Sequence, residues 1–232
     1  MSPIQQMLLG TPSTSGDGVG PSVSFDGSND YLSIPDNSVF SLGTDDFTIE
    51  TFYKAASGYS GYDCLVSFGW KFQLYLEEGA FKFWAEGTSS YFIQGAFANT
   101  GSNSVSEDTW YHVAVTRSGN VFRLFLDGVQ KYSTTSSSSF GVPNSIAAIG
   151  SFTGVNYYAD GLMSNFRFTK GQALYTSNFT KPSAPLTTTS QGATASNVKL
   201  LCCNTSGNPA GSTVTPDTIT NNGATASSGG PF

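Results

Sequence analysis

Few side chains in this sequence are of the types that hydrolyse glycosidic bonds, and their spacing does not bring them together. Such hydrolysis needs two carboxyl groups that flank the sugar bond, and alternating positions on one strand would point both into a cleft. The adjacent pair Glu77-Glu78 falls at an expected turn, where we expect the two side chains not to converge, and Glu86 comes one strand later, also at a turn. His112, the single histidine, has no serine or carboxylate partner at a recognisable spacing, so we interpret it as a hydrogen-bonded residue of a sheet. The sequence therefore predicts a protein that is not an enzyme.

Two expected loops combine tyrosines with polar side chains, a composition that suits carbohydrate binding. Aromatic rings stack on sugar faces, and Asn or Asp side chains bond to hydroxyl groups. Tyrosine is also enriched in protein interfaces, so contact with a neighbouring subunit is the alternative, and it is the interpretation we favour. The candidate contact residues are Tyr59 and Tyr62 in the first loop, and Asn156, Tyr157, Tyr158 and Asp160 in the second.

No metal or other cofactor is assigned from the sequence. Asp26, Asp30 and Asp160 lie in expected loops, where their carboxylates could meet around calcium. Asp26 followed by glycine is also an ordinary turn, so calcium stays an unassigned alternative.

The three cysteines are interpreted as buried free thiols. In a strand, alternation would send the side chains of the adjacent pair Cys202 and Cys203 to opposite faces. Cys64 stands alone, and with one histidine in the chain no closely spaced metal-ligand set is present in the sequence. Thiols that act as small hydrophobic groups indicate folding in a reducing compartment.

Charge and hydropathy exclude two classes of partner. The 232 residues carry a formal net charge of -6, with only 10 Lys and Arg that are scattered singly. Nucleic-acid binding needs clustered positive charge, so it is disfavoured. No apolar run approaches the roughly 20 residues of a membrane span, and the first ten residues lack the pattern of a signal peptide.

The periodicity predicts an all-β fold, a two-sheet antiparallel sandwich. The pattern is plainest in residues 110–131, where two alternating segments flank Ser118-Gly119-Asn120, and Asp127-Gly128 marks a second tight turn. On one face of this hairpin lie Tyr111, Val113 and Val115 with Phe122, Leu124 and Leu126; the other face is mixed. Further strands are expected at 22–25, 31–34, 47–54, 64–68, 72–76, 80–85, 91–97, 146–149, 161–169 and 198–203.

Both ends of the chain are expected to extend from this sandwich. Residues 1–21 read as an N-terminal arm, 22–203 as the sandwich, and 204–232 as an extended C-terminal tail. This tail could also form one or two loose strands, for example over 212–220, and we expect it to order only against a partner surface, its own or a neighbour's. The one expected helical turn lies near residues 170–177, and Pro182 and Pro185 then favour an extended crossing segment.

Several of these stretches resemble one known family. Residues 24–31 (SFDGSNDY), 46–50 (DFTIE), the hairpin and 161–167 (GLMSNFR) resemble, in the same order, laminin-G-like domains of the concanavalin A-like lectin/glucanase superfamily. This resemblance implies a concanavalin A-like jelly roll. It does not by itself choose among lectin, adhesin, glycosidase and structural roles.

A second resemblance concerns the setting of the protein. Residues 167–171 (RFTKG), 175–182 (YTSNFTKP) and 184–186 (APL) resemble a signature of bacteriophage virion proteins, with Leu174 where a basic residue is usual. The resemblance implies a non-enzymatic capsid decoration or fibre-type subunit on the virion surface, assembled in the host cytoplasm. Its arms would dock it to other virion proteins as a homo-oligomer, and its loops would hold host glycans weakly. The alternatives are a tail adhesin or receptor-binding lectin and a polysaccharide-degrading enzyme.

Overall fold

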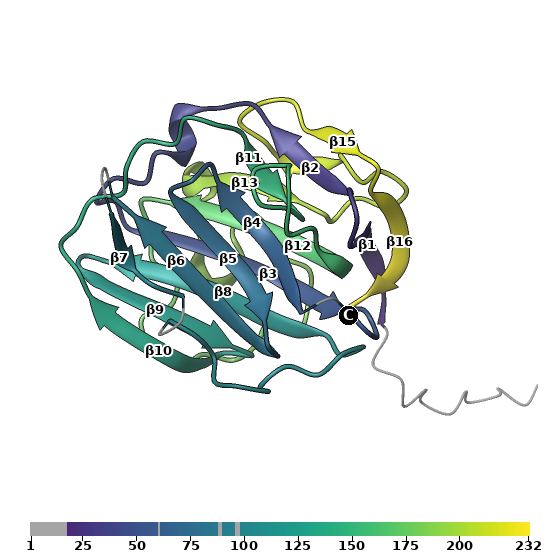
Figure 1. Cartoon of the computed structure of the whole chain (residues 1–232), viewed down its shortest axis with the longest axis horizontal. Helices are drawn as coiled ribbons and strands as arrows, with labels where there is room; N and C mark the ends of the chain where they lie inside the picture. Colours follow the sequence, from purple (N-terminus) through teal and green to yellow (C-terminus); the bar gives the residue numbers. More distant parts are fainter. Residues whose placement is uncertain (1–17, 60, 88–89, 96–97) are drawn as a thin grey trace, which may run out of the picture.

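Two antiparallel β-sheets pack face to face in the computed structural model, which describes residues 18–59, 61–87, 90–95 and 98–232 (Figure 1). Sheet A has the strand order β10-β9-β8-β3-β12-β1-β16, and β13 and β14 extend it beyond β12. Its strands are β1 (Gly18–Asp26), β3 (Phe47–Ala55), β8 (Tyr111–Ser118), β9 (Val121–Leu126), β10 (Val129–Thr135), β12 (Asp160–Lys170), β13 (Val198–Cys202), β14 (Ser212–Val214) and β16 (Thr225–Gly230). The predicted all-β sandwich is confirmed.

Sheet B lies in front of sheet A in Figure 1 and has the order β15-β2-β11-β4-β5-β6-β7. Its strands are β2 (Tyr31–Ile34), β4 (Tyr62–Phe68), β5 (Phe72–Glu77), β6 (Ala80–Glu86), β7 (Tyr91–Ile93), β11 (Ala147–Ile149) and β15 (Thr220–Asn222). Three short 3-10 turns, Ser38–Phe40, Ser190–Gly192 and Ala195–Asn197, complete the regular elements of the described residues. None of these helical turns is long and apolar enough to cross a membrane.

The hairpin forms as its sequence pattern predicts. Ser118 pairs with Val121 across the first turn, and Asp127 and Gly128 both have positive φ (48° and 81°), as a two-residue type I′ turn requires. Val113 and Val115 join the buried core between the sheets. The mixed face of the hairpin points away from that core.

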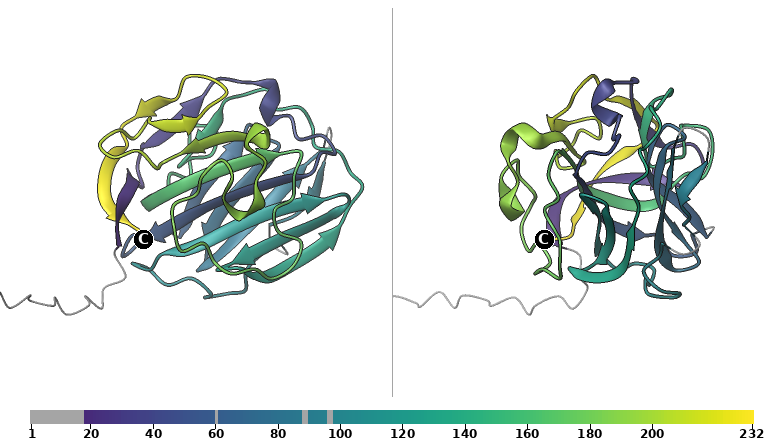
Figure 2. Two further views of the ribbon diagram at one scale, coloured as in Figure 1. Left: turned by 180° about the vertical axis from the view of Figure 1, so that it is seen from behind. Right: turned by 90° about the vertical axis from the view of Figure 1, so that its left-hand side faces the viewer.

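A cover segment, residues 171–197, crosses the outer face of sheet A and buries that mixed face (Figure 2). Its Tyr175 stacks on Phe179 with ring centroids 3.6 Å apart. Leu186 of the cover segment packs in one cluster with Phe52 of β3 and with Trp110, which directly precedes β8. The predicted helical turn near 170–177 is wrong: Lys170 ends β12, and residues 171–177 follow as bends and irregular backbone. The backbone groups of Leu174 and Tyr175 bond to the side chains of Thr48 and Thr116 in the sheet instead of closing a helical turn.

A buried ionic cluster bonds the cover segment to sheet A. Arg167 donates from Nε and Nη2 to Oε1 of Glu50, at 2.8 and 2.6 Å, and from Nη1 to the carbonyl oxygen of Thr187 at 2.7 Å. Tyr175 donates to Oε2 of Glu50 at 2.8 Å. Burial alone would raise the pKa of Glu50, but the His112 hydrogen bond and the Arg167 charge outweigh it and lower that pKa.

His112 is a hydrogen-bonded sheet residue, as predicted. Its Nε2 lies 3.0 Å from Oε2 of Glu50, a carboxylate partner that sequence spacing did not identify. Since Glu50, His112 and Arg167 are completely buried, this cluster stabilises the structure and is closed to substrates.

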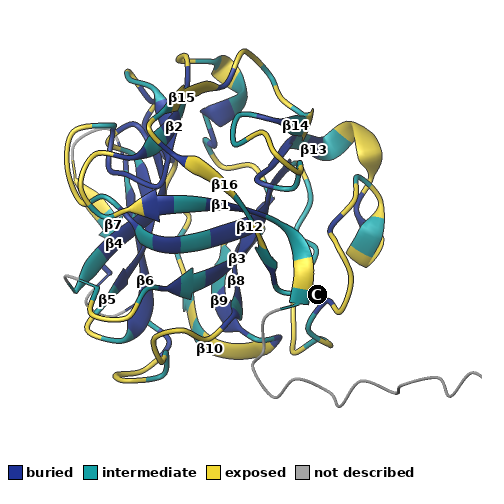
Figure 3. Cartoon of the chain, turned by 90° about the vertical axis from the view of Figure 1, so that its right-hand side faces the viewer, coloured by how far each residue is buried: buried dark blue, intermediate teal, exposed yellow. Residues whose placement is uncertain are grey.

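The C-terminal segment, residues 204–232, forms three strands on the chain's own sandwich, so of the two expected forms it takes the strands and not the extended tail. β14 pairs with β13, β15 pairs with β2, and β16 pairs with β1, so the segment completes edges of both sheets (Figure 3). Phe232 packs edge-on against Phe52, with centroids 4.9 Å apart. Most of the expected N-terminal arm, residues 1–17, lies outside the described residues, and Gly18–Pro21 belongs to β1.

The adjacent cysteines do not point to opposite faces, contrary to the prediction. β13 ends at Cys202, and Cys203 has a positive φ of 57°, which turns its side chain back into the same core. The two sulfur atoms lie 3.8 Å apart. All three cysteines are free and buried, as expected.

Candidate functional site

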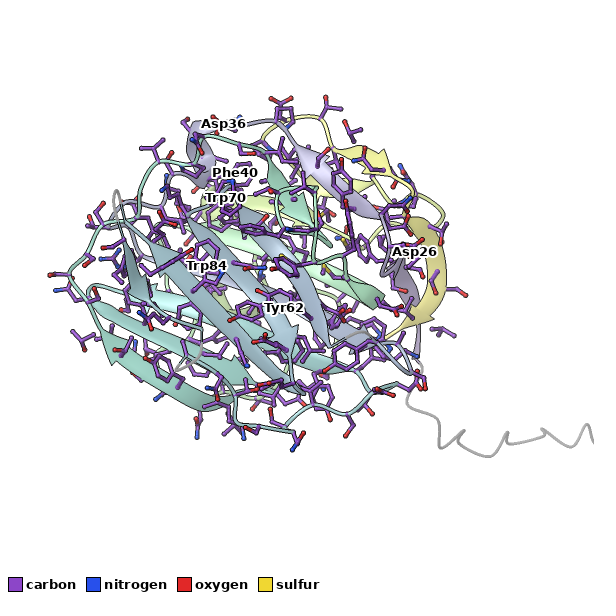
Figure 4. All side chains as sticks on the ribbon, in the orientation of Figure 1. Asp26, Asp36, Phe40, Tyr62, Trp70 and Trp84 are labelled. Carbon is purple, nitrogen blue, oxygen red and sulfur yellow. The ribbon has the colours of Figure 1, made fainter. Side chains whose placement is uncertain are left out.

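The outer face of sheet B carries a group of exposed aromatic rings, here called the aromatic face. Trp70, Tyr91 and Tyr157 expose 49%, 53% and 48% of their surface, and they lie around the half-buried ring of Trp84. In Figure 4, Tyr62, Trp70 and Trp84 lie on the side of sheet B that faces away from sheet A. Strand alternation explains this, because Phe81, Phe83 and Ala85 of β6 enter the core and leave Lys82 and Trp84 on the outside.

The rings of the aromatic face hold one another in edge and face contacts. Trp84 meets Tyr91 at 5.2 Å and Phe152 at 5.9 Å, and Trp70 meets Phe152 at 4.5 Å, all with steep interplanar angles. Phe152 lies 6.2 Å from Tyr157, which links the loop before β12 to this group. Edge-to-face contacts of this kind add to the energy of area burial.

Gln73 orients two of these rings from beneath. Its side-chain oxygen accepts hydrogen bonds from the Trp84 indole nitrogen and from the Tyr62 hydroxyl, the latter at 3.1 Å. Tyr62 in turn stacks flat on Tyr75, with centroids 4.7 Å apart and an interplanar angle of 9°. The polar ends of the Trp84 and Tyr62 rings are therefore fixed, while part of the apolar surface of each ring faces outward.

A shallow cavity of about 200 Å³ opens beside Trp84 and is lined by Trp84, Tyr91, Gln94 and Gly95. Gly95 is required there, because a Cβ atom at this position would overlap the hydroxyl of Tyr75. The rings of Trp84 and Tyr91 meet at an angle of 79°, and the exposed amide of Gln94 lies beside them. Together they form a corner that fits a small ring with apolar faces and polar substituents, such as a sugar. Cavities for drug-sized ligands span about 300 to 1,000 Å³, so this one suits a single sugar ring.

The charged groups of the aromatic face are paired with one another. Lys71 Nζ lies 3.0 Å from Glu86 Oε1, and Lys82 Nζ lies 2.8 Å from Glu77 Oε2 and 3.3 Å from Glu78 Oε2. The two adjacent glutamates thus converge, which corrects the expectation that they could not. They converge on an ammonium group that holds both, so they do not flank an open cleft.

The structure brings together only some of the predicted contact residues. Tyr62 and Tyr157, from the two separate loops, meet with ring centroids 4.3 Å apart. Asn156 is exposed in the same loop as Tyr157. Tyr59 turns inward, where its hydroxyl accepts a hydrogen bond from the backbone N–H of Gly79 at 3.0 Å, and Tyr158 packs against Tyr31 at 6.2 Å.

Asp160 belongs to a different place, the rim where β12 begins. It lines a second cavity of about 220 Å³ together with Lys54 and Asp108. Burial first and the nearby Asp26 second raise its pKa. Asp26 itself accepts backbone hydrogen bonds from Ser28 at 2.9 Å and Asn29 at 3.2 Å, which lower its pKa and identify it as a turn residue.

Calcium at this rim stays the unassigned alternative that the sequence left open. Among the described residues no group of three or more His, Cys, Asp or Glu side chains is placed to hold a metal ion.

The most exposed rings of the aromatic face, Trp70 and Tyr91, and the central Trp84 were absent from the sequence-based candidates. One feature of the sequence could have identified this face: in the segment AFKFWAE, Trp84 shares a strand face with Lys82 and Glu86. A tryptophan on the polar side of an alternating strand indicates exposed apolar surface. Trp70 directly follows Gly69 in a turn and offered no periodicity.

A two-sheet sandwich with one outer face covered and the other bearing exposed aromatic rings defines a lectin-like domain. A family model described as the concanavalin A-like lectin/glucanases superfamily matches residues 26–174. The chain therefore belongs to this superfamily. No curated protein matches the sequence.

Solved structures share the fold at low identity. A Bacteroides ovatus ATCC 8483 protein for which carbohydrate binding has been suggested aligns with a TM-score of 0.63 at 16% identity, over 90% of this chain and 60% of that one. The CBM40 module of the Ruminococcus gnavus IT-sialidase gives 0.50 at 14%, over 67% of this chain and 94% of that one. A leech intramolecular trans-sialidase gives 0.51 at 15%, over 68% of this chain and 27% of that one. The chain thus spans about 60% of the Bacteroides protein, and these likenesses concern the fold alone.

Proposed function

We propose that this protein is a non-catalytic carbohydrate-binding domain that holds glycans on the aromatic face of sheet B. The observation that carries the proposal is the half-exposed set Trp70, Tyr91 and Tyr157 around Trp84, on the outer face of sheet B, whereas the cover segment packs on sheet A. Apolar rings left in water on a well-packed sandwich indicate a binding surface. The carbohydrate-binding neighbours of the same fold support this choice of ligand.

Binding at this face is expected to be weak for a single domain. The cavity of about 200 Å³ accepts one sugar ring, and a ligand on the surface leaves much of its area in water. Several copies on one particle would raise the overall avidity by factors of about 10² to 10⁴. A weak single site therefore suits a protein that acts in many copies.

The three tryptophans of the chain provide the test. Trp70 and Trp84 lie on the aromatic face, whereas Trp110 is buried against the cover segment. A bound glycan should change the emission of the wild-type protein and of Trp110→Phe, and the change should shrink in Trp70→Phe and Trp84→Phe.

Binding itself is measured with a glycan array and affinity electrophoresis. Trp70→Ala and Tyr91→Ala should bind about tenfold more weakly, while Val129→Ala, an exposed apolar change on sheet A, should bind as wild type does. Equal binding by all of these variants would exclude the aromatic face as the site.

For the setting we propose the virion of a bacteriophage, with the protein as a capsid decoration or fibre-type subunit that docks to other virion proteins as a homo-oligomer. The support is the resemblance of residues 167–186 to a virion-protein signature. Its Arg167 and Tyr175 both bond to Glu50, so this part of the signature stabilises the cover segment. Mass spectrometry of purified particles tests the assignment, and a chain confined to the host lysate would contradict it.

A receptor-binding lectin on the tail is the second candidate, since an exposed aromatic face would serve it equally. Immunogold labelling of particles distinguishes the tail from the capsid. An enzyme would instead release reducing ends from the bound polysaccharide, and we expect none to be released.

A further inference from the structure

The distribution of charge limits which glycans the aromatic face can accept. Of the 10 basic residues in the sequence, all except Lys71 and Lys82 belong to strands of sheet A or to the cover segment. The residues on the sheet A side are Lys54, Arg117, Arg123, Lys131, Arg167, Lys170, Lys181 and Lys199. The three arginines of the chain are all in this group.

Both lysines of sheet B are engaged by carboxylates. Their side chains are only 16% and 10% exposed, and they lie 3.0 Å from Glu86 and 2.8 Å from Glu77. Glu78, whose side chain is 82% exposed, adds a second carboxylate to Lys82. Three carboxylates therefore face two ammonium groups, and the surplus charge of the face is negative.

The outward polar groups beside the rings are neutral. Gln94 lines the cavity, Asn156 is exposed in the adjacent loop, and the hydroxyls of Tyr91 and Tyr157 belong to exposed side chains. Amides and hydroxyls match the hydroxyl groups of an uncharged sugar. Recognition of a carboxylate or sulfate instead calls for charge-assisted donors, above all the forked guanidinium of arginine.

We infer that the aromatic face selects neutral glycans and rejects their sialylated, sulfated or uronic-acid-bearing counterparts. The inference rests on the proposed glycan-binding function and adds the chemical class of the ligand. An anionic group placed over the rings would face the surplus carboxylate with no unpaired cation among the described residues of the face.

The test compares matched glycans on one array, for example lactose with 3′-sialyllactose and 3′-sulfolactose, and neutral arabinoxylan with glucuronoxylan. Wild-type protein should bind the anionic member of a pair at least about fivefold more weakly than the neutral member. The double variant Glu77→Gln/Glu78→Gln releases Lys82 and should narrow this difference. Asp36→Asn/Asp217→Asn changes the net charge equally, at exposed positions outside the aromatic face, and should not narrow it.

The outcomes separate the two claims. Anionic glycans bound as tightly as neutral ones, with binding still lost in Trp70→Ala, would overturn the charge selection and leave the glycan-binding function standing. A protein that binds no glycan of either class would overturn both.

Discussion

The hydroxyl oxygen of Tyr53 lies 2.7 Å from Oδ2 of Asp63, and both side chains are fully buried. The same hydroxyl lies 3.0 Å from the carbonyl oxygen of Asp160. Tyr53 has one proton to donate to these two acceptors, so its hydroxyl compensates a buried Asp63 carboxylate only in part, and the neutral acid is favoured. Asp63 Oδ1 has no hydrogen-bond partner among the described residues, which also favours the neutral acid.

Stability should therefore fall as pH rises toward neutrality. Burial raises the pKa of Asp63 from 3.8 to about 7, and the Tyr53 hydrogen bond offsets only part of this. Between about pH 4 and pH 7 the folded protein holds a proton that the unfolded chain has released. As the pH rises across this interval, the free energy of unfolding therefore decreases by up to about 4 kcal/mol. Urea unfolding at several pH values should show this slope.

Asp63→Asn should flatten the pH dependence, because the amide cannot lose a proton in this range. Asp217→Asn, at an exposed position, should keep the wild-type slope. An unchanged slope in Asp63→Asn would refute the assignment of the proton to Asp63.

Arg167→Leu should destabilise the protein by about 3 to 5 kcal/mol, because it removes the buried guanidinium that pairs with the Glu50 carboxylate. Lys181→Ala breaks a pair with Asp127 at 2.8 Å, but there both side chains are about one-third exposed, so the loss should stay below about 1 kcal/mol. Denaturant unfolding monitored by circular dichroism measures both. Equal losses would mean that the buried cluster contributes no more than a surface pair.

Gly95→Ala should weaken both folding and glycan binding. The new methyl group would overlap the Tyr75 hydroxyl, and the displaced ring would disturb the stack with Tyr62. Overpacking of this kind costs about 1 to 3 kcal/mol. Gly229→Ala is the control, because the nearest atom lies 3.8 Å from the added Cβ. We expect this variant to fold and bind as the wild-type protein does. Thermal melting and array binding of the two variants give the comparison, and wild-type behaviour of Gly95→Ala would contradict the required close approach.

Removal of residues 212–232 should abolish cooperative unfolding. The truncation strips β14, β15 and β16 from the sheets, so β1 and β2 lose one partner strand each and present open edges. It also removes Ile219 and Ala224 from the core and Phe232 from its contact with Phe52. Thermal unfolding and size-exclusion chromatography are the measurements. A truncated chain that melts at the wild-type temperature would show that the C-terminal strands add nothing to the fold.

The strands and the hairpin could be read from the sequence because alternation is a local property. The two-residue period of a strand places Val113 and His112 on opposite faces, and the apolar residues that share the Val113 face identify it as the core face. The last strand, β16, was not predicted for the same reason: Thr225–Gly230 has almost no apolar alternation, and it is held in place by pairing with β1.

Tertiary structure alone decided which distant residues meet. The aromatic face joins Trp70 and Trp84 of sheet B to Phe152 and Tyr157 of a loop that follows much later in the chain. Glu50 finds Arg167 only because β3 and β12 are neighbours in sheet A. Composition and period fix the face on which a side chain lies within its own strand. Its partners on other strands are determined by strand order and by the course of the loops. Strand order depends on contacts between residues far apart in the chain, so local sequence patterns do not predict it.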